Sequence, residues 1–336
     1  MRRSWVLALV LPFLLGLALV VDYQRSLNRP LGLAEPMVYQ VAPGTSLRRL
    51  AAELSQQDLL QRPRYWEFHA RRSDLAARIR AGEFELLPEM TARDLLTLLT
   101  SGQMVQYSLT VPEGWTFRQL LVALHTHPYI TVTLEDEEVA GIMNLLGMPD
   151  AHPEGWFFPD TYAFPRGTTD LEFLRRAHQR MQRALHEVWE ERQPNLPLQS
   201  AYEALILASI IERETGRADE RERVSAVFTE RLRRGMRLQT DPTVIYGMEQ
   251  FDGRIRRSDL RRDTPYNTYL HAGLPPTPIG LPGLASLRAA VNPADEEVLF
   301  FVSRGDGSHH FSKTYEEHRR AVIDYLLGGD ASRYGR

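Results

Sequence analysis

Two glutamates near the end of one predicted helix are the residues of this chain best suited to acid–base chemistry. The segment 201–215 has helical spacing of apolar residues, and at 100° per residue its bulky side chains fall on one broad stripe. Glu214 lies on that stripe, three and four residues after Ile211 and Ile210. Glu212 points nearly the opposite way. Because apolar surroundings raise the pKa of a carboxyl, Glu214 is predicted to be a protonated general acid, unless it reaches water past the last buried turn.

A series of long, ordered motifs surrounds this helix. The motifs are Ala208–Thr215, Arg221–Phe228, Arg234–Gly247, Glu154–Tyr162, Tyr266–Tyr269 and Gly273–Gly283. Together they resemble the MltG (YceG-like) family of endolytic murein transglycosylases, and the resemblance extends over nearly the whole chain. In that family pattern the catalytic acid is the glutamate that precedes a threonine, which is Glu214 here.

The resemblance implies an enzyme that acts on peptidoglycan. It implies cleavage of the β-1,4 bond from N-acetylmuramic acid to N-acetylglucosamine inside nascent glycan strands, without water, which leaves 1,6-anhydro ends and stops elongation. It also implies wall synthases such as penicillin-binding proteins as partners. Hydrolysis normally requires two carboxylates, whereas this reaction requires one. The non-catalytic alternative is a membrane-anchored scaffold that binds the wall.

The same motifs contain the candidate substrate-binding residues. Gln239 is a candidate sugar contact, and so is Asp241, although a following proline also gives Asp241 the form of a helix N-cap. Tyr266 and Asn267 resemble a Tyr-Asn pair of lytic transglycosylases, whose aromatic face and amide suit a pyranose and its acetamido group; the alternative is a plain loop turn.

Two further candidates flank these motifs. Thr215 follows the acid, as serine does in other lytic transglycosylases, and Glu154 opens the aromatic motif. The aromatic residues after Glu154 are either a sugar platform or, as clustered aromatics more often are, part of the core: Trp156, Phe157, Phe158 and Tyr162.

Composition and motifs argue against several other kinds of chemistry. The 336 residues include no cysteine, and the formal net charge of −3 provides no field for nucleic acid. His309 and His310 would point to opposite faces of a strand, and with His318 they match no metal-binding spacing. No metal and no cofactor is expected, since phosphate-loop, dinucleotide and nucleophile-elbow motifs are also missing.

The N-terminus predicts a single membrane anchor. Arg2 and Arg3 precede an uncharged run from Trp5 to Val21, which is near the shortest length for a bilayer span. The run lacks a small-x-small cleavage site, which favours an uncleaved anchor over a signal peptide or a buried helix. Residues 1–4 are then cytoplasmic, 5–21 span the inner membrane, 22–36 form a tether, and the catalytic domain is periplasmic.

The rest of the chain predicts an α+β fold. One design recurs three times: a short strand, a turn with proline, and a hydroxyl residue that opens a Leu-rich helix. The copies are Val38–Val41 with Leu47–Leu54, Glu83–Leu87 with Thr91–Leu99, and Tyr107–Val111 with Thr116–Leu124. The first copy resembles a LysM-like glycan-binding module, with a structural spacer as the alternative. We expect this module at 37–106 and a catalytic domain at 107–330.

Further elements are expected in the catalytic domain. They are an acidic helical stretch over 128–153, helices at 170–191 and 220–234, strands at 298–303 and 309–312, and a helix capped by Thr314. Gly216 and Gly235 are expected to end helices, Gly216 in a left-handed conformation. The segment 274–282, rich in proline and glycine, is expected to be an ordered loop.

Overall fold

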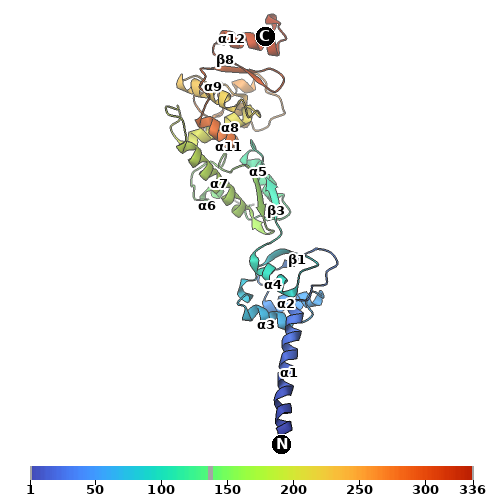
Figure 1. The fold of residues 1–336 in the computed structure, drawn as a ribbon. Helices are drawn as coiled ribbons and strands as arrows, with labels where there is room; N and C mark the ends of the chain where they lie inside the picture. The colour runs from blue at the N-terminus through green and yellow to red at the C-terminus, as the bar shows by residue number, and fades with distance from the viewer. Residues whose placement is uncertain (1, 135–138, 335–336) are drawn as a thin grey trace. The chain divides into compact units, whose positions relative to one another are not determined.

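The protein has a mixed α+β fold, as the sequence predicts (Figure 1). The computed structural model describes residues 2–134 and 139–334, without the side chains of residues 2–9, 11, 139 and 140. The chain divides into two compact units. Unit 1 comprises Met1–Ser108 and Ala163–Thr168, and unit 2 comprises Leu109–Tyr162 and Thr169–Arg336. The predicted boundaries at residues 36 and 106 stay predictions.

Helix α1 (Arg2–Leu27) contains the predicted anchor. Its last residue, Leu27, is fully buried in the core of unit 1, whereas Phe13 is 71% exposed. Among the residues that the structure describes, no helix is both long and apolar enough for a membrane crossing. The side chains of Trp5 and its neighbours lie outside the described part, so the predicted anchor is not confirmed.

Unit 1 packs helices against a two-stranded antiparallel sheet, in which Met37 pairs with Leu86 and Val41 with Gly82. Its further elements are β1 (Met37–Val41), α2 (Leu47–Gln56), α3 (Pro63–Arg72), η1 (Ala76–Arg78), β2 (Gly82–Leu86) and α4 (Ala92–Ser101). Most of the leucines in α2 and α4 are buried in one core with Trp66 and Phe84, whereas Leu47 and Leu98 are partly buried.

The chain from Tyr107 onward alternates helices with short strands. Its elements are β3 (Tyr107–Thr110), α5 (Phe117–His125), β4 (Ile130–Thr131), α6 (Val139–Leu145), β5 (Thr161–Phe164), β6 (Thr168–Thr169), α7 (Asp170–Glu190), α8 (Ala201–Glu214), α9 (Arg221–Arg233), α10 (Asp241–Tyr246), η2 (Asp259–Arg261), α11 (Leu284–Val291), β7 (Phe300–Ser303), β8 (His309–Ser312), α12 (Tyr315–Leu326) and η3 (Ala331–Arg333). Strand β3 pairs with β5, β4 with β6, and β7 with β8.

Hydroxyl caps begin the helices of all three repeats, as predicted. The Ser46 side chain accepts a hydrogen bond from the backbone N–H of Arg49 at the start of α2. Thr91, Thr116 and Thr314 form complete capping boxes at α4, α5 and α12. Such a cap satisfies N–H groups that have no partner inside the helix, at a gain of about 1 kcal/mol each. These local signals fix where the helices start.

Helix α8 forms the centre of unit 2. It packs against α7, α9, α10 and α11 (Figure 1). Every residue from Ala204 to Ile211 is buried, so the prediction of a single apolar stripe is wrong. Because neighbours cover this helix on all sides, small residues such as Ala208 and Ser209 are as buried as Leu207. Glu214 is the last residue of α8.

Three further predictions need correction. Gly216 is not left-handed: the C-cap of α8 is Thr215, whose backbone is extended at φ −140°, and Gly216 has no positive φ. Thr240, not Asp241, is the N-cap of α10. In the acidic stretch 128–153, residues 135–138 lie outside the described part, and the remainder forms β4 and the short α6. Gly235, at φ +64°, does follow α9 as predicted.

Candidate active site

The carboxyl of Glu214 lies at a surface cavity of about 380 Å³ in unit 2. The cavity is assembled from the ends of α8 and α9, the segment before α10, β7 and the start of α12. It is lined by Glu214, Arg231, Leu238, Gln239, Asp241, Tyr269, Phe300, Phe301, Tyr315 and His318. The lining thus combines two carboxyl groups, a guanidinium, an imidazole and the rings of two tyrosines and two phenylalanines.

Burial is the main influence on the charge of Glu214. The pKa of this carboxyl is raised to about 7, mainly by loss of hydration and also by the negative charge of Asp241. A hydrogen bond from the Thr240 hydroxyl to Oε1 of Glu214 acts in the opposite direction, as do the positive charges of His309 and Arg231. The raised pKa brings the protonated form of Glu214 toward neutral pH, as a general acid requires.

The segment before α10 holds the Thr240 hydroxyl in place. The backbone N–H groups of Gln239 and Thr240 donate to the carbonyl oxygen and Oγ1 of Thr268, each at 3.1 Å. Thr243 Oγ1 donates to the carbonyl oxygen of Thr240 at 2.8 Å. Gln239 has a φ of +50°, in the left-handed region that non-glycine residues seldom adopt. This conformation leaves the Gln239 side chain exposed at the cavity while Thr240 is buried.

Arg231 on α9 is a buried guanidinium in the wall of the cavity. It donates to the carbonyl oxygens of Leu299 at 2.8 Å and Leu238 at 2.6 Å, and its Cζ lies 5.3 Å from the centre of the Phe300 ring. Burial lowers the pKa of Arg231, while the charge of Glu214 opposes this change. Arg231 could not be predicted from the sequence, because α9 carries four arginines and their spacing does not show which of them faces a cavity.

Tyr269 and Asp241 face each other at the cavity. The Tyr269 hydroxyl donates to Oδ1 of Asp241 at 2.6 Å. Burial, followed by this hydrogen bond, raises the pKa of Tyr269, so the phenol stays neutral. From the sequence, Tyr269 is part of the motif Tyr266–Tyr269 but is not a predicted site residue. Its hydroxyl is placed by tertiary contacts between segments 28 residues apart.

The structure brings three of the predicted site residues together at the cavity: Glu214, Gln239 and Asp241. Thr215 is not among the lining residues. It is 4% exposed, and its Oγ1 accepts a hydrogen bond from the backbone N–H of Arg217 at 3.1 Å. Thr215 therefore shapes the exit from α8.

Tyr266 and Asn267 also lie outside the cavity lining. Asn267 is fully buried, and its Nδ2 donates to the carbonyl oxygens of Leu260 at 3.2 Å and Arg262 at 2.7 Å. The amide is thus engaged in holding its own loop. The Tyr266 hydroxyl is 2.9 Å from Oγ1 of Thr277. Sugar-binding roles for this pair stay predictions.

Glu154 occupies a different buried place in unit 2. It is 3% exposed, and its carboxylate accepts hydrogen bonds from the backbone N–H of Phe117 at 2.9 Å and the Tyr246 hydroxyl at 3.0 Å. Burial raises its pKa to about 7. The following Gly155 has a φ of +86°, and a Cβ there would lie 2.5 Å from Pro278. Glu154 does not line the Glu214 cavity.

The aromatic residues beside Glu154 belong mainly to the core. Phe157, Phe158 and Tyr162 are each at most 8% exposed. Trp156 is partly buried and stacks on Tyr202, with ring centres 5.7 Å apart. These three rings therefore belong to the core, and they do not form a sugar platform.

Glu212 has surroundings unlike those of Glu214, as the helical spacing predicts. Its Oε2 accepts a hydrogen bond from the backbone N–H of Gly283 at 2.9 Å, and its Oε1 lies 3.5 Å from the guanidinium of Arg221. A paired carboxylate of this kind stabilises the contact between α8 and the start of α11. It does not reach the cavity.

The chain was compared with known proteins. The family model described as the YceG-like family matches residues 39–324, which include the whole site. The chain belongs to the YceG-like family. The segment that carries Glu214, Gln239 and Asp241 thus lies within the part of the chain that defines this family.

Curated relatives carry a common name. An endolytic murein transglycosylase of Bacillus subtilis (strain 168) is 29% identical over 304 residues, which cover 85% of this chain and 84% of the relative. An endolytic murein transglycosylase of Streptococcus pneumoniae serotype 2 is 24% identical and covers 96% of this chain, which spans 66% of that relative. A solved yceG-like protein of Listeria monocytogenes is 26% identical, with a TM-score of 0.54 over 85% of this chain.

Proposed function

We propose that this chain is an endolytic murein transglycosylase that cleaves glycan strands of peptidoglycan without water. One observation carries the proposal: a carboxyl with a pKa near neutrality, Glu214, lies at an open cavity with aromatic walls. Relatives named endolytic murein transglycosylase and membership of the YceG-like family support it.

The first step is a proton transfer from Glu214. The protonated carboxyl donates to the glycosidic oxygen between N-acetylmuramic acid and N-acetylglucosamine, and the C1–O bond breaks. The leaving sugar departs with a free hydroxyl. The nearby charges of Arg231 and His309 favour the carboxylate that this step leaves behind, because both lower the pKa of Glu214.

The second step returns the proton to Glu214. The carboxylate accepts the proton of the C6 hydroxyl of the same muramic acid, and the C6 oxygen attacks C1 to close a 1,6-anhydro ring. An intramolecular attack of this kind is favoured because both reacting atoms belong to one bound sugar. The carboxyl ends the cycle protonated, so no second acid or base is consumed.

The cavity walls support sugar binding. The rings of Tyr269 and Tyr315 offer apolar faces for pyranose C–H groups, and the exposed Gln239 side chain offers an amide for an acetamido group. Asp241 is the second carboxylate at the cavity, and its Oδ1 accepts the Tyr269 hydrogen bond. Activation of a water by Asp241 would give hydrolysis instead, which the products distinguish.

Mass spectrometry of digested peptidoglycan tests the proposal. We expect 1,6-anhydro-muramic acid ends from the wild-type chain and none from Glu214→Gln. Reducing ends formed from solvent water would replace the proposal with hydrolysis by two carboxylates. Tight binding of strands without any cleavage would replace it with a wall-binding scaffold.

The membrane anchor remains part of this proposal. The uncharged run from Trp5 to Val21 after Arg2 and Arg3 supports a single span with the catalytic unit outside the inner membrane, where wall synthases such as penicillin-binding proteins act. The full-length chain should stay with membranes after a carbonate wash, and a reporter fused after Arg336 should be periplasmic. Recovery of a shortened soluble form cut near Val21 would favour a signal peptide.

A glycan-binding role for the predicted module at 37–106 is also proposed. A groove of about 500 Å³ in unit 1 combines apolar and amide side chains, among them Val38, Met104, Gln103 and Gln106. The double change Gln103→Ala with Gln106→Ala should weaken sacculus binding several-fold and leave cleavage of soluble strands unchanged. Unchanged sacculus binding would make the module a spacer.

A further inference from the structure

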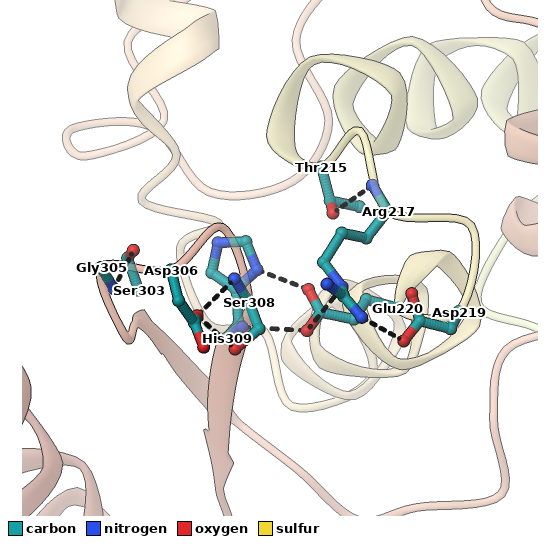
Figure 2. A network of polar contacts seen from close by, with 9 residues as sticks. All are labelled: Thr215, Arg217, Asp219, Glu220, Ser303, Gly305, Asp306, Ser308 and His309. Carbon is teal, nitrogen blue, oxygen red and sulfur yellow. Dashed lines mark hydrogen bonds and ion pairs between the residues drawn. The ribbon is translucent and has the colours of Figure 1, made fainter.

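A buried carboxylate–histidine pair lies beside the site in unit 2, and neither of its residues transfers a proton in the reaction proposed above. Glu220, at the N-terminal end of α9, is 6% exposed, and the His309 side chain on β8 is 15% exposed. Two hydrogen bonds join them: the backbone N–H of His309 donates to Oε1 of Glu220 at 2.9 Å, and Nδ1 of His309 lies 2.7 Å from Oε2 (Figure 2). Both carboxylate oxygens are therefore directed at one residue.

This pair connects the exit of the Glu214 helix to the wall of the cavity. Thr215, the residue after Glu214, accepts a hydrogen bond from the backbone N–H of Arg217. Nε of Arg217 lies 3.7 Å from Oε1 of Glu220 (Figure 2). On the other side, His309 stands opposite Ser303 in the β7–β8 register. A chain of polar contacts thus runs from the end of α8 to the β hairpin.

The hairpin supplies the aromatic wall. Phe301 of β7 lines the cavity, and its ring packs edge-on against the His309 ring, with centres 5.4 Å apart. Phe311 of β8 lies behind both rings, at 6.0 Å from Phe301. Anchoring His309 to Glu220 therefore also fixes Phe301 at the cavity.

The hydrogen bond to Glu220 decides which ring nitrogen of His309 carries a proton. A carboxylate can only accept hydrogen bonds, so Nδ1 of His309 must carry its proton toward Glu220. When Nε2 carries a proton as well, the ring is positively charged. A positive charge on His309 lowers the pKa of Glu214.

We infer that His309, held by Glu220, is a positioning residue of this site, which fixes the aromatic wall and sets the charge beside Glu214. The inference rests on the proposed role of Glu214. The other charged groups near Glu214 are Arg231 of α9 and Asp241 of α10. Near the pair, Arg217 and Asp219 of the α8–α9 connection form an ion pair at 2.7 Å. In the hairpin turn, the Asp306 carboxylate accepts a hydrogen bond from the backbone N–H of Ser308.

The sequence neighbour of His309 provides a matched control. His310 lies on the opposite face of β8, and its ring packs against Tyr325, with centres 5.6 Å apart. Its positive charge acts on His318 of the cavity lining, whereas the carboxylate of Glu220 binds His309. His310→Gln therefore makes the same chemical change one position along the same strand.

The test is the pH dependence of kcat/KM for cleavage of isolated glycan strands by the full-length chain, from pH 5 to pH 9. The alkaline limb reports loss of the Glu214 proton. In His309→Gln the positive charge is gone, so Glu214 keeps its proton to higher pH and the limb should move up by about half a pH unit. His310→Gln should leave the limb in place.

Glu220→Gln tests the link between the two residues. The amide oxygen can still accept the His309 backbone N–H, but a neutral amide does not attract a protonated ring as a carboxylate does. The limb should move in the same direction as in His309→Gln. In the double variant it should move no further than in His309→Gln, since Glu220 acts through His309.

Three outcomes decide the question. A moved limb in His309→Gln and an unmoved one in His310→Gln supports the inference. Lower activity in His309→Gln with the wild-type limb overturns it, and so does a fully wild-type profile; thermal unfolding of each variant shows whether it is folded. Full activity of Glu214→Gln would instead overturn the proposed function, so the two failures are distinct.

Discussion

Unit 2 holds two buried carboxyls whose pKa values both rise to about 7, and only one of them lies at a cavity. Glu214 lies at an open space with aromatic walls, where a substrate oxygen can meet its proton. Glu154 has its oxygens occupied by the backbone N–H of Phe117 and the Tyr246 hydroxyl. A raised pKa therefore identifies a candidate acid, and access decides whether it can act.

The largest effect is expected from the accessible carboxyl. Glu214→Gln keeps the shape of the side chain and removes both proton transfers, so turnover of glycan strands should fall by about two orders of magnitude or more. Release of 1,6-anhydro products measures it. The matched control is Glu212→Gln on the same helix, where a carboxylate paired with Arg221 is replaced and turnover should change only a few-fold. Equal losses in both variants would contradict the comparison.

The inaccessible carboxyl should affect stability instead. The pKa of Glu154 rises from 4.5 to about 7 on folding, so the folded state holds its proton more tightly. That stabilisation is complete below pH 4.5 and is lost as the pH rises through 7, at a cost of about 3 kcal/mol. Glu154→Gln cannot titrate. Its melting temperature should fall less between pH 5 and pH 8 than that of the wild-type chain.

An exposed glutamate controls for this effect. Glu316 on α12 is 58% exposed in its ion pair with Arg320, and Glu316→Gln should reproduce the wild-type pH dependence. Glu214→Gln should resemble Glu154→Gln in this measurement, because its pKa also rises to about 7. The two variants would then have similar pH dependence of the melting temperature, whereas only Glu214→Gln would lose turnover. A wild-type pH dependence in Glu154→Gln would argue against a raised pKa at that residue.

A smaller effect is expected at the neighbour of Glu214. The negative charge of Asp241 raises the pKa of Glu214, so Asp241→Asn should lower that pKa and move the alkaline limb of kcat/KM down by about half a pH unit. This shift is opposite in sign to the one expected from His309→Gln. Tyr269→Phe removes the hydrogen bond to Asp241 but keeps its charge, and should leave the limb in place. An upward shift in Asp241→Asn would contradict the assignment of Glu214 to that limb.

The smallest effect concerns one hydrogen bond to Glu154. Tyr246→Phe removes the O–H donor at 3.0 Å, which should lower the free energy of unfolding by about 1 kcal/mol and leave turnover nearly unchanged. Tyr202→Phe is the matched control, since its ring stacks on Trp156 in the same core. Its loss should be smaller, as measured by urea denaturation. A large loss of turnover in Tyr246→Phe would extend the active site to Glu154.

The elements that the sequence predicted best are those set by local chemistry. Ser46, Thr91, Thr116 and Thr314 cap their helices because a hydroxyl and the next turn's N–H groups are neighbours in the chain. The prediction for Gly216 was wrong because Thr215 leaves the helix extended and its hydroxyl binds the Arg217 N–H.

The site itself was predicted only in part. Residues in the long motifs could be chosen, and three of them, Glu214, Gln239 and Asp241, line one cavity. Arg231 could not be predicted as a site residue, because its guanidinium is held in place by hydrogen bonds to carbonyl oxygens of two separate segments. Asn267 was chosen for its amide, whose hydrogen bonds to its own loop depend on folded geometry. Sequence spacing indicates a helix face, but it does not give the partner across a cavity.

The left-handed backbone of Gln239 has a consequence for engineering. A non-glycine residue at φ +50° costs about 1 kcal/mol, and burial of an ionisable Glu214 adds to that cost. The residues at the cavity therefore lower the stability of the folded state, as is common where a strained or buried group is needed for activity. An inactivated Glu214→Gln chain should melt at a higher temperature than the active protein above pH 7. Such a chain is the better starting material for capturing an intact glycan strand in the cavity.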